Sequence, residues 1–347
     1  MPDALRGNAT TILVTGEMLD ATHIGLLKEA GFSPTFCPTH LDSDALVDAL
    51  QGVSGYILGG VEHVREDVLS QCPDLRIIAV LGVGYDVFVD VEAATALGIA
   101  VTNTPDTNAR SVAELTIALL LDVERRVSYS NAEAKRGHTA QVLAREISRS
   151  RIGIVGMGAI GSSAAQILRF GFDADICYYS PTRKPGIERE LGATALTLPA
   201  LLEESDAVLL CARSSRETDG LIGEDELHRM RPTTVLINTA RPMLVDGHAL
   251  YAALTKRQIA AAAFDGYYTE PLPSPADDPY RLLSLPDDRF IVTPHIGAFT
   301  RNAVSRMNAK AVASLTSFLR SGTAEHIVNP AFASQTHMRG HNRLERL

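Results

Sequence analysis

Short runs of β-branched and aliphatic residues alternate with amphipathic segments along the first third of the chain. The apolar runs lie at residues 11–17, 34–38, 54–60, 75–82 and 99–105. Residues 20–31 and 42–52, which stand between such runs, place apolar side chains at the spacing of one helical face. Strands that alternate with helices in this way predict a parallel β-sheet covered by helices.

A second series of the same kind begins at Arg151. Its apolar runs lie at residues 151–156, 174–179, 207–212, 233–239, 259–268 and 289–295. The length agrees with two series, because 347 residues exceed the roughly 250 to 300 at which a single hydrophobic core stops growing. We therefore expect an α/β fold with two doubly wound parallel-sheet domains.

Two long helical patterns flank the second series. Residues 111–137 predict one helix, capped by Ser111 and ended near Gly137, that leads from the first domain into the second. Residues 299–322 predict another helix, after which the HIVNP segment would fit back against the first domain. The expected divisions are a discontinuous first domain at 1–110 plus 299–334, a second domain at 111–298 and a loose C-terminal tail at 335–347.

Charge and cysteine content argue against several classes of function. A net charge of −9 without a visible basic face disfavours a nucleic-acid partner. The four cysteines are far apart and lie in or beside apolar runs, which favours core positions over the alternative of metal binding. No apolar run reaches the roughly 18 residues of a membrane helix, and the N-terminal residues show no export signal. We expect a cytoplasmic protein with no membrane partner and no metal.

The segment RIGIVGMGAIG contains a specific motif. Gly156, Gly158 and Gly161 have the GxGxxG spacing directly after a predicted strand and directly before a predicted helix. In such a turn the first glycine makes the bend, the second admits a pyrophosphate to backbone N–H groups, and the third lets helix and strand pack closely. The helix N-terminus adds a partial positive charge. Glycine clusters also mark ordinary turns, but this context favours a dinucleotide site.

The turn after the second strand of this domain carries two cations. About 20 residues beyond the glycines, NAD-binding folds usually place an acid that binds the ribose 2′-hydroxyl. The chain has Ser180 there, followed by Arg183 and Lys184. A small hydroxyl with two cations suits a ribose that carries a 2′-phosphate, because arginine can make a forked contact with it. We expect a preference for NADP, with NAD as the other cofactor; the alternative interpretation is a solvated turn.

Three chemically capable residues follow three strands of the second domain. Arg241, Glu270 and His295 stand at the strand ends where ligands bind in doubly wound sheets. Taken singly, they have ordinary alternatives as a surface arginine, an acid before a proline turn and a histidine capping a strand. Together, beside a cofactor cradle, they predict a catalytic site.

These motifs together resemble the D-isomer-specific 2-hydroxyacid dehydrogenases, the family of D-lactate, glycerate and phosphoglycerate dehydrogenases. The similarity covers nearly the whole chain and includes LGVGYDVFVDVEAA, GIAVTNTPDTNARSVAELTIALLL, the glycine motif, NTARxxxVDxxAL, FDxxxxEP and TPHIG. It implies a flavodoxin-like substrate domain and a Rossmann NAD(P)-binding domain. It also implies an enzyme that reduces a small-molecule 2-keto acid to a D-2-hydroxy acid, with glyoxylate or hydroxypyruvate as default test substrates.

The resemblance implies a role for each catalytic candidate. Arg241 would bind the keto acid, His295 would be the acid/base, and Glu270 would pair with His295. The chemistry of the side chains agrees. Hydride transfer to a ketone creates an alkoxide that needs a proton donor near neutral pH, and histidine is the natural one. A carboxylate would orient the imidazole and favour its charged form, while arginine can fork onto a carboxylate and polarise the neighbouring carbonyl.

The resemblance also implies binding residues. Backbone amides of Val83 and Gly84 would hold the substrate carboxylate, and Asp265 would meet the nicotinamide carboxamide. Further cofactor contacts are expected at Ala159, Ile160, Thr218, Thr239, Ala240 and Gly297.

Three positions depart from the family pattern. Pro242 follows the catalytic arginine where glycine is usual, which biases Arg241 toward extended backbone angles. Gly266 stands where valine is usual and removes side-chain bulk under the site. Arg213 stands where proline is common, and it points into solvent or contacts cofactor phosphate, with a second anionic group on the substrate as the alternative. These changes bear on the substrate more than on the reaction.

Two other functions and a dimer follow from the same scaffold. A dinucleotide-sensing co-repressor is the alternative function, which retention of the catalytic residues disfavours. Oxidation of formate or phosphite is disfavoured because formate dehydrogenases of this fold resemble the pattern with glutamine where Glu270 stands. By resemblance we expect a homodimer. An apolar stripe of Ile117, Leu120 and Leu121 would suit its interface, and is equally consistent with packing inside the subunit.

Overall fold

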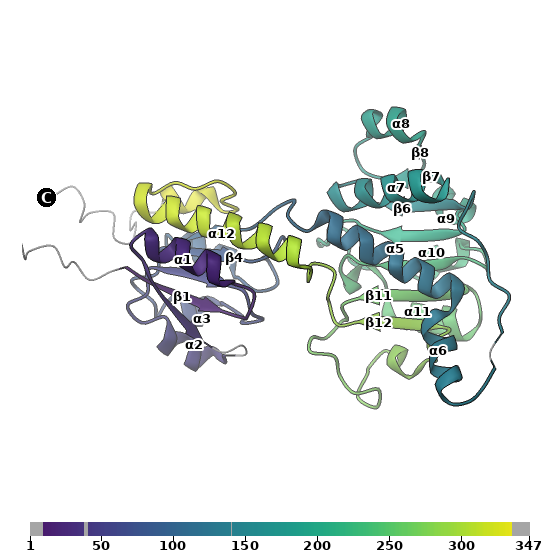
Figure 1. The fold of residues 1–347 in the computed structure, drawn as a ribbon, viewed down its shortest axis with the longest axis horizontal. Coiled ribbons are helices and arrows are strands. Elements are labelled where there is room, and N and C mark those ends of the chain that lie inside the picture. The colour runs from purple at the N-terminus through teal and green to yellow at the C-terminus, as the bar shows by residue number, and fades with distance from the viewer. Residues whose placement is uncertain (1–9, 38–40, 140, 335–347) are drawn as a thin grey trace, which may run out of the picture. The chain divides into compact units, whose positions relative to one another are not determined.

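The computed structural model describes residues 10–37, 41–139 and 141–334. The chain divides into two compact units, the first formed by Met1–Asn108 and Thr300–Leu347 and the second by Ala109–Phe299 (Figure 1). The tail expected at 335–347 lies outside the described residues. Within the described ranges, no helix is long and apolar enough to cross a membrane.

The first unit is built on a five-stranded parallel sheet with the strand order β2-β1-β3-β4-β5. The strands are β1 (Thr11–Thr15), β2 (Ser33–Cys37), β3 (Gly55–Leu58), β4 (Ile77–Val80) and β5 (Ala100–Thr102). The helices that alternate with them are α1 (Ala21–Glu29), α2 (Ser43–Ala49), α3 (Glu66–Leu69) and α4 (Val91–Ala96). This is the flavodoxin-like order, and the predicted parallel sheet is confirmed.

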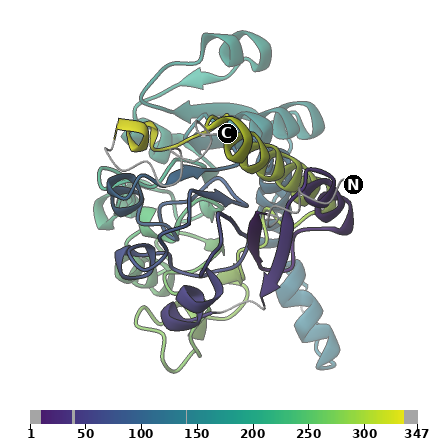
Figure 2. The same ribbon diagram turned by 90° about the vertical axis from the view of Figure 1, so that its left-hand side faces the viewer.

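The long C-terminal helix packs on this first sheet. Helix α12 (Arg301–Ser321) begins at Thr300, whose hydroxyl accepts a hydrogen bond from Ala303 N–H. It contacts α1 and lies beside it in Figure 2. Its buried side chains include Met307, Ala311, Leu315 and Phe318.

The segment after α12 returns to the edge strand β5. Val328 N–H donates to the Val101 carbonyl oxygen, and Val101 N–H donates to the Asn329 side chain at 2.8 Å. The short helix η3 (Pro330–Ser334) ends the described chain. The predicted return of HIVNP is therefore made by hydrogen bonds along β5.

The second unit contains a seven-stranded parallel sheet with the order β12-β11-β10-β9-β6-β7-β8. The strands are β6 (Arg151–Val155), β7 (Asp175–Tyr179), β8 (Thr194–Ala195), β9 (Ala207–Leu210), β10 (Val235–Asn238), β11 (Ala261–Asp265) and β12 (Phe290–Thr293). The first six strands in chain order have the Rossmann arrangement, with the order reversing between β6 and β9. The two-residue edge strand β8 was not predicted, because one threonine and one alanine carry no apolar run.

Helices cover this second sheet. They are α5 (Ala109–Arg125), α6 (Val127–Lys135), α7 (Ala159–Phe172), α8 (Pro185–Leu191), α9 (Leu198–Glu204), α10 (Glu224–Arg229) and α11 (Gly247–Thr255), with two short 3₁₀ turns, η1 (Pro242–Leu244) and η2 (Leu282–Ser284).

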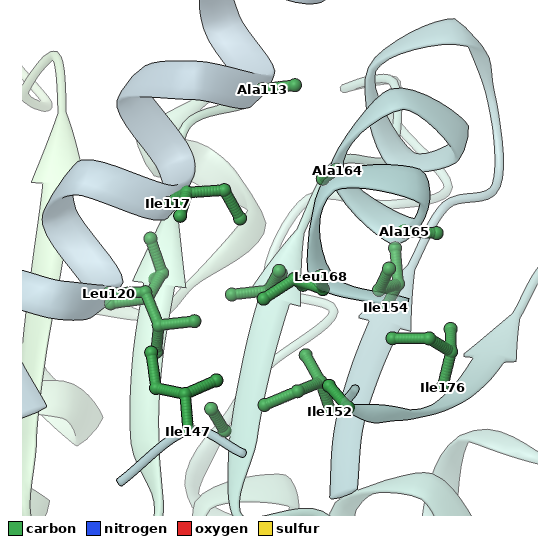
Figure 3. Close-up of a cluster of buried hydrophobic side chains, with 14 of the residues drawn as sticks. Ala113, Ile117, Leu120, Ile147, Ile152, Ile154, Ala164, Ala165, Leu168 and Ile176 are labelled. Atoms are coloured by element: carbon green, nitrogen blue, oxygen red, sulfur yellow. The ribbon is translucent and has the colours of Figure 1, made fainter. Parts of the chain in front are cut away.

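The apolar stripe of α5 packs inside the subunit. Ile117 and Leu120 are buried in the core of the second unit, and Figure 3 shows them pointing toward Leu168 of α7. Leu121 is partly buried against the same cluster. Of the two interpretations of this stripe, internal packing is the one the structure supports.

The prediction of one helix from Ser111 to Gly137 is wrong in two respects. The helix begins earlier, at Ala109, and the Ser111 hydroxyl donates to the Gly297 carbonyl oxygen at 2.7 Å instead of capping. It is then interrupted at Arg126, which has a left-handed φ of 52°. The Asp122 carboxylate stabilises the break because it accepts hydrogen bonds from both the backbone N–H and the hydroxyl of Ser128.

Candidate active site

The glycine turn between β6 and α7 has the geometry of a phosphate cradle. Gly156 has a φ of +99°, and a Cβ there would lie 2.5 Å from the Ala212 backbone. A Cβ on Gly161 would lie 2.2 Å from the Gly156 carbonyl oxygen, whereas one on Gly158 would meet nothing within 4 Å. Among the described residues, no side chain caps α7. The open helix end and the free space at Gly158 fit a dinucleotide pyrophosphate.

Arg241, Glu270 and His295 come together at the carboxyl edge of this sheet. They follow β10, β11 and β12, which are neighbours in the sheet. His295 Nδ1 lies 3.1 Å from each carboxylate oxygen of Glu270, and His295 Nε2 lies 3.3 Å from Nη1 of Arg241. The imidazole therefore has an acid at one nitrogen and a cation at the other.

The pKa of the Glu270 carboxyl lies below its ordinary value. Burial favours the neutral acid, but the hydrogen bond and charge of His295 outweigh it, and Tyr267 N–H and Arg241 act in the same direction. Tyr267 N–H donates to Glu270 Oε1 at 3.3 Å. An ionised Glu270 can only accept, so we assign a proton to Nδ1 of His295.

Gly266 makes room for the Glu270 carboxylate. Its φ is +96°, and a Cβ there would lie 2.8 Å from Glu270 Oε1 and 3.6 Å from the His295 ring. A side chain at 266 would displace the carboxylate and would also strain the backbone. The space that glycine leaves at position 266 is therefore occupied by the Glu270 carboxylate beside His295.

Asp265 orders the loop that carries His295. Its carboxylate is buried and accepts hydrogen bonds from the Thr293 hydroxyl at 2.7 Å and from Ile296 and Gly297 N–H, both at 2.8 Å. His295 itself has a left-handed φ of 56°, which is uncommon for a residue with a side chain. Asp265 fixes the residues on both sides of this bend. Its expected contact with the nicotinamide carboxamide stays a prediction.

Pro242 has the predicted effect on Arg241. Arg241 is extended, with φ −113° and ψ 140°, and Pro242 begins the 3₁₀ turn η1. The Asn238 side-chain amide donates to the Arg241 carbonyl oxygen at 3.0 Å. The backbone under the guanidinium is thus held by a proline on one side and a hydrogen bond from β10 on the other.

The turn after β7 contains an acid that sequence reasoning missed. The Arg183 guanidinium donates from Nε and Nη2 to the two oxygens of Glu188, at 3.1 and 2.6 Å. The Tyr178 hydroxyl donates to Glu188 at 2.7 Å and accepts from Lys184 N–H at 2.7 Å. Ser180 lies at the start of the turn and is partly exposed. Glu188 is in α8, beyond the positions where an acid is sought after a Rossmann strand, so only its five-residue spacing from Arg183 signals the pairing.

The loop after β9 is ordered by its own contacts. The Thr218 hydroxyl donates to the Arg213 carbonyl oxygen at 2.9 Å and accepts from Ser215 N–H at 2.8 Å. The Arg213 residue is exposed. A contact of Thr218 with the cofactor, as predicted, would use the same hydroxyl that makes these two hydrogen bonds within the turn.

Four further candidates lie at the same sheet edge. Ala159 and Ile160 begin α7 beside the glycine turn. Thr239 and Ala240 follow β10, and the Thr239 hydroxyl lies 2.7 Å from that of Thr116. The contact between the two hydroxyls links the end of β10 to α5. Thr239 therefore lies at the sheet edge and also stabilises it.

Val83 and Gly84 belong to the first unit, in the loop after β4. The Asn103 side-chain amide donates to the Val83 carbonyl oxygen at 2.8 Å, and Thr104 N–H donates to the Gly82 carbonyl oxygen at 2.9 Å. Two hydrogen bonds thus tie this loop to the residues after β5. Their role toward the substrate stays a prediction.

The cysteines and acids give no metal centre in the described part of the chain. No cluster of three or more His, Cys, Asp or Glu side chains there could hold a metal ion. Cys72 and Cys177 are buried, Cys37 and Cys211 are partly buried, and all four are free thiols.

Comparison with known proteins adds sequence relatives and a solved structure. Residues 117–297 match the family described as D-isomer specific 2-hydroxyacid dehydrogenase, NAD binding domain. The glyoxylate reductase of Aeropyrum pernix is 40% identical over 277 residues, which cover 77% of this chain and 80% of that protein. The glyoxylate reductase of Korarchaeum cryptofilum is 37% identical over 294 residues, or 83% of each chain. A glyoxylate reductase structure from Paecilomyes thermophila matches with a TM-score of 0.80 at 26% identity, covering 93% of this chain and 99% of that one.

Proposed function

The chain belongs to the D-isomer specific 2-hydroxyacid dehydrogenase family, and we propose that it reduces a 2-keto acid to the D-2-hydroxy acid with NADH or NADPH. The observation that carries the proposal is the His295 imidazole, placed between the Glu270 carboxylate and the Arg241 guanidinium. When bound, the nicotinamide ring supplies the hydride. The protein must then supply a proton and stabilise negative charge on the substrate oxygen.

His295 is the proton donor in this proposal. Nδ1 is held by Glu270, so Nε2 is the nitrogen from which a proton leaves for the substrate oxygen. The ionised Glu270 carboxylate lies beside Nδ1 and attracts a positive charge on the imidazole. Arg241, 3.3 Å from Nε2, is close enough to polarise the same oxygen.

The substrate carboxylate is bound by Arg241 in this proposal. A guanidinium can form two parallel hydrogen bonds with a carboxylate and still lie beside the keto group. Backbone amides of Val83 and Gly84 are the further donors that we assign to the carboxylate.

Glyoxylate is the first substrate to test, with hydroxypyruvate second. Two relatives that are 40% and 37% identical are glyoxylate reductases. The experiment is an assay of NADH and NADPH oxidation over a panel of 2-keto acids, with chiral analysis of each product. Turnover of at least one 2-keto acid to the D-product is expected. Tight binding of a dinucleotide without turnover of any keto acid would instead favour the co-repressor function.

We assign the 2′-phosphate of NADP to the turn after β7. Ser180 stands where an NAD-selecting acid is usual, and Arg183 and Lys184 add positive charge. The double substitution Arg183→Ala with Lys184→Ala is expected to weaken NADPH binding by a larger factor than NADH binding. Equal weakening of both cofactors would refute this assignment without touching the proposed reaction.

We also propose a homodimer whose interface includes α6 rather than the stripe of α5. Among the described residues of α6, none is buried in the subunit, and Leu143 in the segment that follows is fully exposed. A second copy of the chain would cover the exposed apolar side chains Val127 and Leu143. Light scattering is expected to give the mass of two chains, and Leu143→Glu is expected to lower it.

A further inference from the structure

The proposed cofactor contacts leave one group at the turn after β7 without a role, the Glu188 carboxylate. It accepts hydrogen bonds from Arg183 Nε and Nη2 and from the Tyr178 hydroxyl. The side chain of Arg183 is 72% exposed, whereas that of Glu188 is 18% exposed. Glu188 is thus the ordered partner, held by the tyrosine of β7, and the arginine extends from it toward solvent.

We propose that Glu188 is a specificity-determining residue that limits the preference for NADPH over NADH. The inference rests on the proposed 2′-phosphate site. Arg183 and Lys184 would present two positive charges to a phosphate, but Glu188 pairs with one of them. The cluster then carries a net charge of about +1 rather than about +2 toward the ligand.

The protonation state of Glu188 supports this role. Hydrogen bonds from Arg183 and Tyr178, together with the charges of Arg183 and Arg189, hold its pKa below the ordinary glutamate value. The acid is therefore ionised at neutral pH. A 2′-phosphate carries about 1.5 to 2 negative charges at that pH, so phosphate and carboxylate compete for the same guanidinium.

Repulsion outweighs the alternative, in which Glu188 merely positions Arg183. An exposed ion pair orients its partner only weakly, so losing that orientation would cost a few-fold in affinity. Removing a negative charge within several ångströms of a phosphate dianion is worth about tenfold in water. The guanidinium also keeps Nη1 and one Nη2 hydrogen for a phosphate, because a bidentate contact through Nε and Nη2 uses only one edge of the fork.

The test is the variant Glu188→Gln, which preserves shape and a hydrogen-bond acceptor but removes the charge. Dissociation constants are measured by fluorescence for NADPH and NADH, and by calorimetry for adenosine 2′,5′-bisphosphate and 5′-AMP. The matched control is Glu190→Gln, which removes the same charge from the same helix at an exposed position bonded to Gln166.

Glu188→Gln is expected to tighten NADPH and the 2′,5′-bisphosphate about tenfold, to leave NADH and 5′-AMP within about twofold, and to lose this gain at high salt. Glu190→Gln is expected to change the ratio of the two cofactors little. Weaker or unchanged NADPH binding in Glu188→Gln would overturn the inference.

The double substitution of Arg183 and Lys184 distinguishes a failure of the proposed phosphate site from a failure of the inference about Glu188. If the double change Arg183→Ala with Lys184→Ala selectively weakens NADPH while Glu188→Gln does not strengthen it, the phosphate site stands and the role of Glu188 is refuted. If the double change affects both cofactors equally, the phosphate site and the inference both fail. The keto-acid reductase activity is tested independently of either result by turnover with NADH.

Discussion

Two charge clusters lie at the carboxyl edge of the second unit's sheet, and they use a carboxylate in opposite ways. Beyond β12, Glu270 contacts one ring nitrogen of His295, and the other lies beside the Arg241 guanidinium. Beyond β7, Glu188 contacts Arg183 through two nitrogens of the guanidinium. In the proposed reaction the first carboxylate assists its partner, whereas the second competes with the ligand of its partner.

The contrast between Glu270 and Glu188 shows that a carboxylate paired with a basic side chain can have opposite effects on function. In the proposed reduction a negative partner assists the histidine, because the charged imidazole is the form that donates the proton. An arginine is charged without any partner, so in the proposed cofactor site the carboxylate beside it reduces the positive charge that a phosphate meets. Substitutions in the Glu270–His295 pair are therefore expected to change the rate of the reaction. Substitutions in the Glu188–Arg183 pair are expected to change the affinity for the cofactor.

The largest effect that separates the clusters is expected for His295→Ala. Loss of the proton donor should lower kcat about 10² to 10⁴-fold, while the dissociation constants of NADH and NADPH stay unchanged. Steady-state kinetics and cofactor titration measure both. His228→Ala, at an exposed position of α10, is the control and should keep full activity. Turnover near the wild-type rate would remove His295 from the mechanism.

Arg241→Lys is expected to raise KM for the keto acid roughly 10- to 100-fold, because a hydrogen bond to a charged group contributes about 1.5 to 3 kcal/mol. A lysine keeps the charge and loses the fork. Initial rates over a range of keto-acid concentration give the value. An unchanged KM would mean that another cation binds the substrate carboxylate.

Gly266→Ala is expected to lower kcat about tenfold with little change in cofactor binding, because its Cβ would displace a carboxylate oxygen 2.8 Å away. The control is Gly137→Ala, which has a similar positive φ of +80° but meets nothing within 4 Å. It carries the backbone strain alone. If both variants lose the same activity, strain rather than the position of Glu270 is responsible.

Glu270→Gln is expected to lower kcat for keto-acid reduction, because the amide lacks the negative charge that lies beside the His295 ring. Stability gives a second reading. The lowered pKa of Glu270 contributes stability above the unfolded value of about 4.3, and this contribution disappears as the pH falls through the folded pKa. The melting temperatures of the wild-type protein and of Glu270→Gln should therefore converge in acid. An unchanged kcat together with unchanged acid stability would contradict the pairing.

Local patterns were sufficient for most of the fold. Runs such as residues 75–82 became buried strands because a central parallel strand must be apolar on both faces. Local patterns failed where a single side chain changed the backbone. The helical periodicity continues through Arg126, yet the Asp122 carboxylate offers Ser128 a competing set of hydrogen bonds and breaks the helix. A strand as short as β8 leaves no pattern at all.

The sequence by itself determined the strand-turn-helix around Gly156, the types of residue at the three strand ends, and the extended backbone of Arg241, because each depends on neighbours along the chain. Only the tertiary structure decided which charges meet. Glu188 lies beside Arg183 because the Tyr178 hydroxyl of β7 holds its carboxylate, and Glu270 reaches His295 because Gly266 leaves space for it. Electrostatic interactions depend on distance in space, and distance in space is set by packing of the whole unit.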